Sequence, residues 1–216
     1  GRSEEGDTDR ERMRRAFESL GGLDGVEAVA ATLLVPYGTG RAVNSQSVNG
    51  RTMDYDYSDV TDDYLAVMGL KIVAGRWFSR EDDGRPWRPV VITRELAREA
   101  FGEDDVVGRD FPEGGSTPEG SGRRKSRVVG VLQAYRPGSD YAPQEPFALF
   151  RADLANPADD VPTRIVVRLR SGTPRAFEER LVRTLEAAVP EWSVTAEPLA
   201  VARDGANRRW NVPLLA

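Results

Sequence analysis

The sequence predicts an α+β protein in which both ends of the chain build one layer of helices and strands, with a mixed α/β subdomain inserted between them. Two observations support this fold class. Residues 10–34 and 174–199 each show the pattern of a helix, a break and a strand. Each end helix also carries one apolar stripe, and a single sheet covered by both helices buries both stripes. We therefore expect strands 26–34 and 165–170 to share a sheet.

The composition limits the possible functions. The 216 residues include no histidine and no cysteine. Without histidine the chain lacks the commonest general base and transition-metal ligand, and without cysteine it has neither disulfides nor thiolate chemistry. Arginine is mixed with acidic residues along a chain of net charge −5, so there is no basic stripe to bind nucleic acid. No apolar run approaches the roughly 20 residues of a membrane-spanning helix.

The chain begins with a predicted helix and strand. Thr8 is expected to cap the helix, with Glu11 as its reciprocal partner, and Gly21 and Gly22 are expected to end it. One face of the helix is apolar and holds Met13, Phe17 and Leu20. The strand at 26–34 follows, and Pro36 ends it in a loop.

Residues 42–60 predict a hairpin with its turn at Asn49 and Gly50. In its second strand, apolar residues alternate with polar ones, which is typical of a half-exposed strand. The apolar set is Met53, Tyr55 and Tyr57. The acidic residues in and after this strand do not have the spacing of a calcium-binding loop, so we expect a solvated edge. They are Asp54, Asp56, Asp59, Asp62 and Asp63.

The stretch 64–78 predicts a short helix, a short strand and a tight turn. Thr61 is expected to cap the helix and Gly69 to end it. The buried side of this helix is assigned to Leu65 and Met68. Gly75 is expected to adopt a positive φ in the turn, and Arg76 to pair with a nearby carboxylate rather than bind an anion.

The middle of the chain predicts three strands and one helix. The strands lie at 89–92, 127–134 and 147–150, and the second is apolar on both faces, which favours a central place in the sheet. The helix is expected to be capped by Thr93 and ended by Gly102.

Two long loops interrupt this region. Residues 112–126 are rich in glycine and serine, so we expect the most mobile internal segment there. Its preferred protease site is Arg123, Arg124 and Lys125. Residues 135–146 carry aromatic residues and arginine, which are typical of interfaces. The candidate partner surface is Tyr135, Arg136 and Tyr141.

The last helix is expected to open at Thr173 and Pro174 and to end at Pro190. Its buried stripe is Phe177, Leu181, Leu185 and Ala188. A further alternating strand is predicted after it, with Trp192, Val194 and Ala196 on one face.

No catalytic, cofactor-binding or metal-binding residue is predicted. The acidic triplet Glu81, Asp82 and Asp83 is expected to be solvated. No phosphate-binding loop is present, and no serine has a histidine base.

Several short pieces, in order along nearly the whole chain, resemble the periplasmic core domain of ABC transporter permeases of the MacB/FtsX type. The matching positions with a structural role are Tyr64, Gly69, Gly75, Arg76, Phe78, Gly102, Gly108 and Gly130. The sequence departs from the family pattern at Leu65, where an aromatic residue is usual.

The resemblance implies an extracytoplasmic domain anchored by two flanking transmembrane helices. It also implies a porter-like subdomain from residues 8–60 and 163–207, an inserted subdomain from 61–162, and the start of a membrane-proximal helix at 208–216. Such a domain performs no chemistry and needs no cofactor. Its expected partners are the membrane-embedded remainder of the permease, the cytoplasmic ATPase, and a periplasmic partner or cargo. The isolated domain is expected to be a monomer or weak dimer with both chain ends on one face.

Two other classes of function remain open. One is a free-standing extracytoplasmic binding domain for a small molecule, lipid or peptide. The other is a carboxylate-based hydrolase, which requires a deep pocket with two converging carboxylates of separated pKa.

Overall fold

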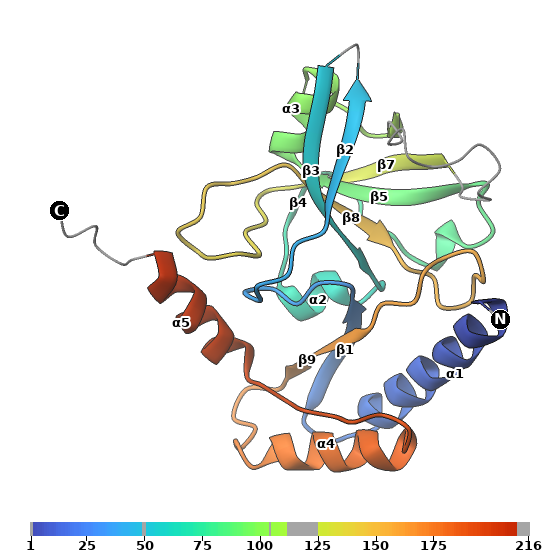
Figure 1. Cartoon of the computed structure of the whole chain (residues 1–216), viewed down its shortest axis with the longest axis vertical. Helices are drawn as coiled ribbons and strands as arrows, with labels where there is room; N and C mark the ends of the chain where they lie inside the picture. Colours follow the sequence, from blue (N-terminus) through green and yellow to red (C-terminus); the bar gives the residue numbers. More distant parts are fainter. Residues whose placement is uncertain (1, 49–50, 104, 112–124, 211–216) are drawn as a thin grey trace.

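The computed structural model describes residues 2–48, 51–103, 105–111 and 125–210. Within these residues a nine-stranded sheet is covered by helices on both faces (Figure 1). The elements are α1 (Arg2–Gly21), β1 (Val26–Thr32), β2 (Val43–Val48), β3 (Arg51–Val60), α2 (Tyr64–Met68), β4 (Ile72–Gly75), the 3-10 helix η1 (Arg80–Asp82), β5 (Trp87–Thr93), α3 (Arg94–Phe101), β6 (Asp110–Phe111), β7 (Lys125–Leu132), β8 (Phe147–Arg151), β9 (Arg164–Leu169), α4 (Phe177–Ala188) and α5 (Leu199–Trp210). The predicted α+β class is confirmed.

The strands follow the order β4-β7-β5-β8-β3-β1-β9, with β2 added to β3 and β6 added to β7. The strands from the two chain ends lie side by side, because β1 pairs with β9 in antiparallel fashion along six residue pairs. The predicted common sheet is therefore confirmed. β1 joins the larger part of the sheet through one residue pair, Thr32 with Val60.

Three apolar clusters hold the helices on the sheet. The first lies between α1, α4, β1 and β9 and centres on Ala16, Leu20, Val26, Val29, Phe177, Leu181 and Leu185. The second packs α3 against the long strands through Val90, Ile92, Leu96, Ala97, Val128 and Val131. The third packs α2 on the sheet through Val60, Tyr64, Phe78, Val91, Leu132 and Leu149. The apolar stripe predicted for α4 is confirmed at Phe177, Leu181 and Leu185, which are buried.

One N-terminal expectation is wrong and a second holds only in part. Thr8 does not cap α1, because the helix already begins at Arg2. The half-exposed pattern of β3 is confirmed in its first half, where Thr52 and Asp54 are exposed, but not in its second half, where Asp56, Ser58 and Asp59 are buried. They are satisfied by partners that lie far away in the sequence, such as Thr32, whose hydroxyl lies 3.0 Å from that of Ser58.

Two predicted helix caps are also wrong, and one is confirmed. The Thr61 hydroxyl accepts a hydrogen bond from the Ala31 amide in β1 instead of capping α2. The Thr173 hydroxyl donates to the Arg170 carbonyl, and α4 begins later, at Phe177. In α3 the Thr93 hydroxyl accepts a hydrogen bond from the amide of Leu96, as predicted.

Residues 192–196 do not form the predicted strand. They run without a strand partner from α4 to α5, past β9 (Figure 1). The predicted turn at 49–50, most of the loop 112–126 and its first two arginines lie outside the described residues.

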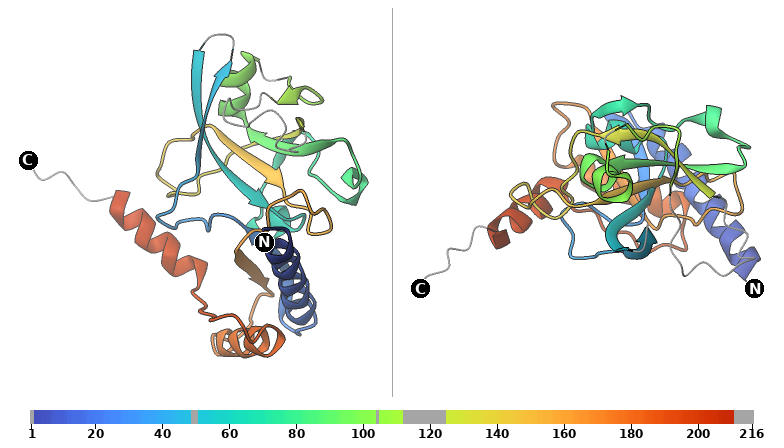
Figure 2. Two further views of the ribbon diagram at one scale, coloured as in Figure 1. Left: turned by 45° about the vertical axis from the view of Figure 1, so that its right-hand side comes forward. Right: turned by 90° about the horizontal axis from the view of Figure 1, so that it is seen from above.

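The helices α1 and α5 splay apart, so α1 begins on one side of the molecule and α5 ends on the other (Figures 1 and 2). The prediction that both chain ends share one face is therefore wrong for this structure.

Candidate functional site

Two glycines of the family motif lie where the turn after β4 touches β7. The Arg76 amide donates a 2.9 Å hydrogen bond to the Val129 carbonyl. A Cβ on Gly75 would overlap that carbonyl, and a Cβ on Gly130 would overlap the carbonyl of Arg76. Gly75 also has the predicted positive φ, at 69°. The close contact of two backbones therefore explains why glycine stands at both positions.

Arg76 makes the predicted pair with a carboxylate. Its guanidinium binds both oxygens of Asp82, at 2.8 and 2.6 Å. Asp82 is 1% exposed, so the prediction of a solvated acidic triplet is wrong at this residue. Burial raises the pKa of Asp82, but hydrogen bonds from Arg76 and from the Ser79 amide outweigh it, and the net pKa is lowered. The pair holds the turn after β4 against η1.

A second arginine, Arg151 at the end of β8, joins three segments. Its side chain is 5% exposed and pairs with Asp62 and Asp83, each at 2.7 Å. The indole of Trp77 donates to the backbone carbonyl of Asp62 at 2.7 Å. The start of α2, the turn after β4 (which we call the motif turn) and η1 are therefore tied to β8.

The predicted solvated edge around β3 is confirmed at Asp54 and Asp63, which are exposed, but not at Asp56 and Asp59, which are buried in ion pairs. Arg88 of β5 binds the carboxylate of Asp59 at 2.8 Å and the carbonyl of Arg151 at 2.8 Å. Arg41 binds both oxygens of Asp56. Each of the two buried carboxylates therefore has an arginine partner.

The motif helix α2 is tied to the loop 135–146 by two tyrosines. The hydroxyl groups of Tyr64 and Tyr135 lie 2.8 Å apart, and both side chains are buried. Burial raises the pKa of Tyr64 to about 12 and raises that of Tyr135 above 10. The prediction that Tyr135 belongs to an exposed partner surface is therefore wrong, whereas Arg136 and Tyr141 are exposed.

The same loop holds α5 through a polar cluster that we call the latch: Tyr37, Ser139, Asp140, Arg203 and Asn207. The Asp140 carboxylate accepts hydrogen bonds from Arg203 at 2.7 Å, Asn207 at 2.8 Å and the Tyr37 hydroxyl at 3.1 Å. The side-chain oxygen Oδ1 of Asn207 accepts in turn from the Ser139 hydroxyl and the Asp140 backbone amide. The bonds from Arg203 and Asn207 lower the pKa of Asp140.

Few apolar contacts support the latch. Ala206 is the buried side chain of α5, while Val201 and Trp210 are 44% and 53% exposed. The attachment of α5 therefore depends mainly on hydrogen bonds, which solvent can replace.

The remaining motif residues have structural places. Gly69 and Gly102 end α2 and α3 in the left-handed conformation. The amide of Gly108 donates to Val128 in β7, and Phe78 is buried against the ring of Trp77.

Sequence reasoning missed Asp82, Arg151 and the latch. An arginine that ends the apolar run Phe147–Arg151 was an available signal for a buried ion pair, because a charge in such a strand needs a partner. The latch residues come from three distant parts of the sequence, so no local pattern predicts that they lie together.

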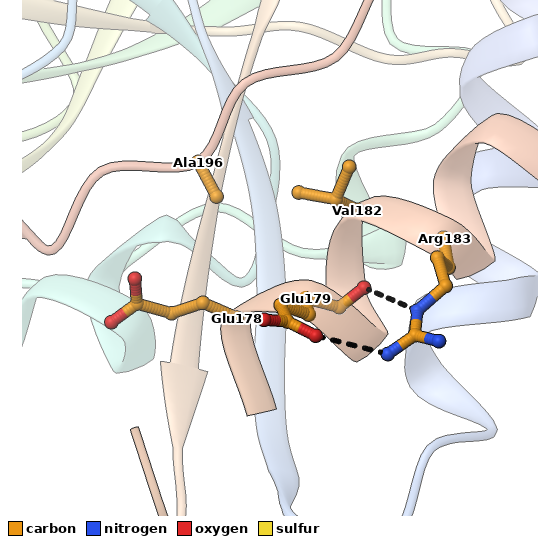
Figure 3. Close-up of a pocket in the computed structure, with 5 residues that line it drawn as sticks. All are labelled: Glu178, Glu179, Val182, Arg183 and Ala196. Atoms are coloured by element: carbon orange, nitrogen blue, oxygen red, sulfur yellow. Dashed lines mark hydrogen bonds and ion pairs between the residues drawn. The ribbon is translucent and has the colours of Figure 1, made fainter. Parts of the chain in front are cut away.

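Between α4 and the segment after it lies an open hollow of about 380 Å³, lined by Glu178, Glu179, Val182, Arg183 and Ala196 (Figure 3). Glu179 and Arg183 pair with each other across one helical turn. Among the residues that the structure describes, no three acidic side chains are grouped to hold a metal ion. Nor does any helix in the described ranges combine the length and apolar character needed to cross a membrane.

Residues 2–184 match the MacB-like periplasmic core domain family. The macrolide export ATP-binding/permease protein MacB of Chromobacterium violaceum is 28% identical over 153 residues, which cover 68% of this chain and 22% of that protein. The chain thus spans about a fifth of that relative's length.

Two solved structures share the fold. The periplasmic region of MacB from Actinobacillus actinomycetemcomitans aligns with a TM-score of 0.56 and 15% identity, covering 81% of this chain and 73% of that one. The extracellular domain of the noncanonic ABC-type transporter YknZ from Gram-positive bacteria aligns with a TM-score of 0.55 and 15% identity, covering 82% and 81%.

Proposed function

This chain belongs to the MacB-like periplasmic core domain family, and we propose that it works as the extracytoplasmic domain of an ABC transporter permease. In this role it catalyses no reaction. It transmits conformational change between the membrane-embedded part of the permease, driven by the cytoplasmic ATPase, and a periplasmic partner or cargo.

The observation that carries this proposal is a continuous set of contacts from α5 to the family motif. The latch ties α5 to Asp140, and five residues earlier in the same loop Tyr135 binds Tyr64 of α2. The motif turn is then tied to η1 and β8 through Arg76 and Arg151. A displacement of α5 would therefore act on the loop that supports α2, because both contacts, at Asp140 and at Tyr135, are made by this one loop.

A free-standing binding domain is the less favoured function. The hollow beside α4 is wide open, and three of its five lining residues are charged: Glu178, Glu179 and Arg183 (Figure 3). Ligand sites are usually concave and enclose most of the surface of their ligand.

We also propose that the subdomain built from the two chain ends, which we call the end-built unit, is smaller than residues 8–60 and 163–207. One apolar cluster is formed by α1, β1, β9 and α4, and β1 joins β3 through a single residue pair. Met53 and Tyr55 of β3 pack instead with Val90 and Ile92 of β5. These contacts support placing β2 and β3 with the inserted region 61–162.

The proposed anchoring is by transmembrane helices on both sides of the chain, with residues 208–216 leading into one of them. The isolated domain is proposed to be a monomer, or a weak dimer, at micromolar concentration. Light scattering that showed a tight dimer would contradict this proposal.

The transmission role can be tested with spin labels in the full-length permease, after replacement of any cysteines elsewhere in it. Labels at Ala200 of α5 and Glu99 of α3, both exposed, report the distance between the two elements. We expect nucleotide binding at the ATPase to change this distance in the otherwise unmodified protein. Arg203→Ala should weaken the change, because it removes the ion pair of the latch.

Arg208→Ala is the matched control, since Arg208 is an exposed arginine on the same helix and makes no latch contact among the described residues. An unchanged distance in the parent protein, or the same change in both variants, would contradict transmission through the latch.

A further inference from the structure

β9 ends the sheet with an open edge. It pairs with β1 on one side, and among the described residues no strand lies on its other side. One of its faces is covered, because Ile165, Val167 and Leu169 pack with the cluster of α1 and α4, and on the other face Val166 packs with the cluster of α2. The outward amides and carbonyls of β9 therefore form a template for one more strand.

The segment after α4 has the pattern of such a strand. Trp192, Val194 and Ala196 alternate with polar residues, and Trp192 and Val194 already pack with the cluster that includes Ile165 and Val167. Pro190 and Pro198 bound the segment, and β9 itself is six residues long. Its side chains are thus placed on the correct face for a neighbour of β9.

Most of the backbone of this segment makes no backbone hydrogen bond in the described structure. The Trp192 amide donates to Val189, but the next backbone donor along the chain is Val201, in α5. Ala196 borders the hollow over α4 (Figure 3), so the end of the segment is loosely packed. The segment has both the free hydrogen-bonding groups and the space to move.

The order β9, α4, segment 192–197 is the order of a βαβ unit. A parallel strand added beside β9 would be connected through α4, which already covers that face of the sheet. Such units are right-handed in nearly all proteins, and the crossover needs about a dozen residues, which α4 supplies.

The latch holds α5, the helix that directly follows this segment. α5 begins at Leu199, two residues after Glu197, and Arg203 lies one helical turn further on. As long as Arg203 and Asn207 hold Asp140, the start of α5 stays beside the loop 135–146.

We propose that the open edge of β9 is the docking site for residues 192–197 of the same chain, which add to the sheet as a tenth, parallel strand when the latch opens. α5 moves with the segment, so its direction relative to α1 changes. The inference rests on the sheet and the chain topology and does not depend on a transport role.

Hydrogen exchange of the 216-residue chain, measured by NMR, tests the proposal. In Arg203→Ala we expect alternate amides of residues 193–197, and the outward amides of β9, to exchange at least tenfold more slowly than in the parent protein. Arg208→Ala should behave like the parent. If residues 193–197 exchange like an unstructured peptide in the parent and in Arg203→Ala, the docking is wrong. If the Arg203→Ala change lowers protection, the latch does not oppose docking.

Two proline variants give a second, independent measurement. Successive amides of a strand point to opposite sides, so only one of Thr195 and Ala196 would donate to β9. In the Arg203→Ala background, proline at that position should abolish the protection of β9, and proline at the other should leave it. Both residues are exposed, so the domain itself should stay folded. Equal effects of the two prolines would overturn the proposal.

Discussion

At the scale of single residues, Gly130 shows how backbone contact selects an amino acid. We expect Gly130→Ala to lower the free energy of unfolding by about 3 kcal/mol, because a Cβ would overlap the Arg76 carbonyl and force the turn away from β7. Urea denaturation measures this loss. Gly138→Ala is the control, since a Cβ there meets no atom within 4 Å. Equal losses in the two variants would show that the contact is not tight.

Arg151 is the residue on which most charge pairs of the motif region depend. Arg151→Met should cost about 2 kcal/mol, because it removes the buried guanidinium that holds the partly exposed carboxylates of Asp62 and Asp83. Arg183→Met, which removes an exposed pair on α4, should cost less than about 0.5 kcal/mol. Thermal or urea unfolding compares the two. If the two variants lose a similar free energy of unfolding, the ion pairs of Arg151 do not stabilise the fold more than an exposed pair does.

Tyr64 makes the stability of the fold sensitive to alkaline pH. Its pKa is raised from 10.0 to about 12 because burial disfavours the phenolate. The unfolded chain therefore loses this proton first, and the stability that is fully present below pH 10 is lost as pH rises toward 12. We expect the urea midpoint to fall in this window, and to fall less in Tyr64→Phe. The same decline in both proteins would assign the effect to other groups.

At the scale of elements, Thr93 joins α3 to the strand and loop beside it. Its buried hydroxyl accepts hydrogen bonds from the amides of Leu96 and Phe147 and donates to the carbonyl of Glu145. Thr93→Val should therefore lower the free energy of unfolding by about 2 kcal/mol. Thr93→Ser keeps the hydroxyl and should lose clearly less. If serine and valine lose the same amount, the methyl group and not the hydroxyl is what matters.

At the scale of the whole molecule, the end-built unit (α1, β1, β9 and α4) and the larger sheet should unfold locally as two separate units. Leu181→Ala should cost about 3 kcal/mol and speed hydrogen exchange in α1, β1, β9 and α4 more than in β5 and β7. Leu96→Ala, in the cluster of α3, should give the opposite pattern. A uniform rise of exchange in either variant would show one cooperative unit.

Local patterns in the sequence determined the elements whose signals lie within a few residues. Helix α3 has its cap at Thr93 and its end at Gly102, and α4 has an apolar stripe at helical spacing. The strand β9 followed from its apolar alternation, and turn and ion-pair chemistry predicted the positive φ of Gly75 and the carboxylate partner of Arg76 correctly. Caps, periodicity and positive φ act between near neighbours, so one sequence is enough to find them.

Only the tertiary structure decided which polar residues are buried and what they bind. Tyr135 meets Tyr64 across 71 positions, and Arg151 meets Asp62 across 89. No local pattern encodes such a distance, so Tyr135 was expected at the surface and Asp82 in solvent. The segment 192–196 shows the same limit for strands: its alternation favours a strand, but a strand exists only where another strand supplies its hydrogen bonds, and that partner is set by the packing of the whole chain.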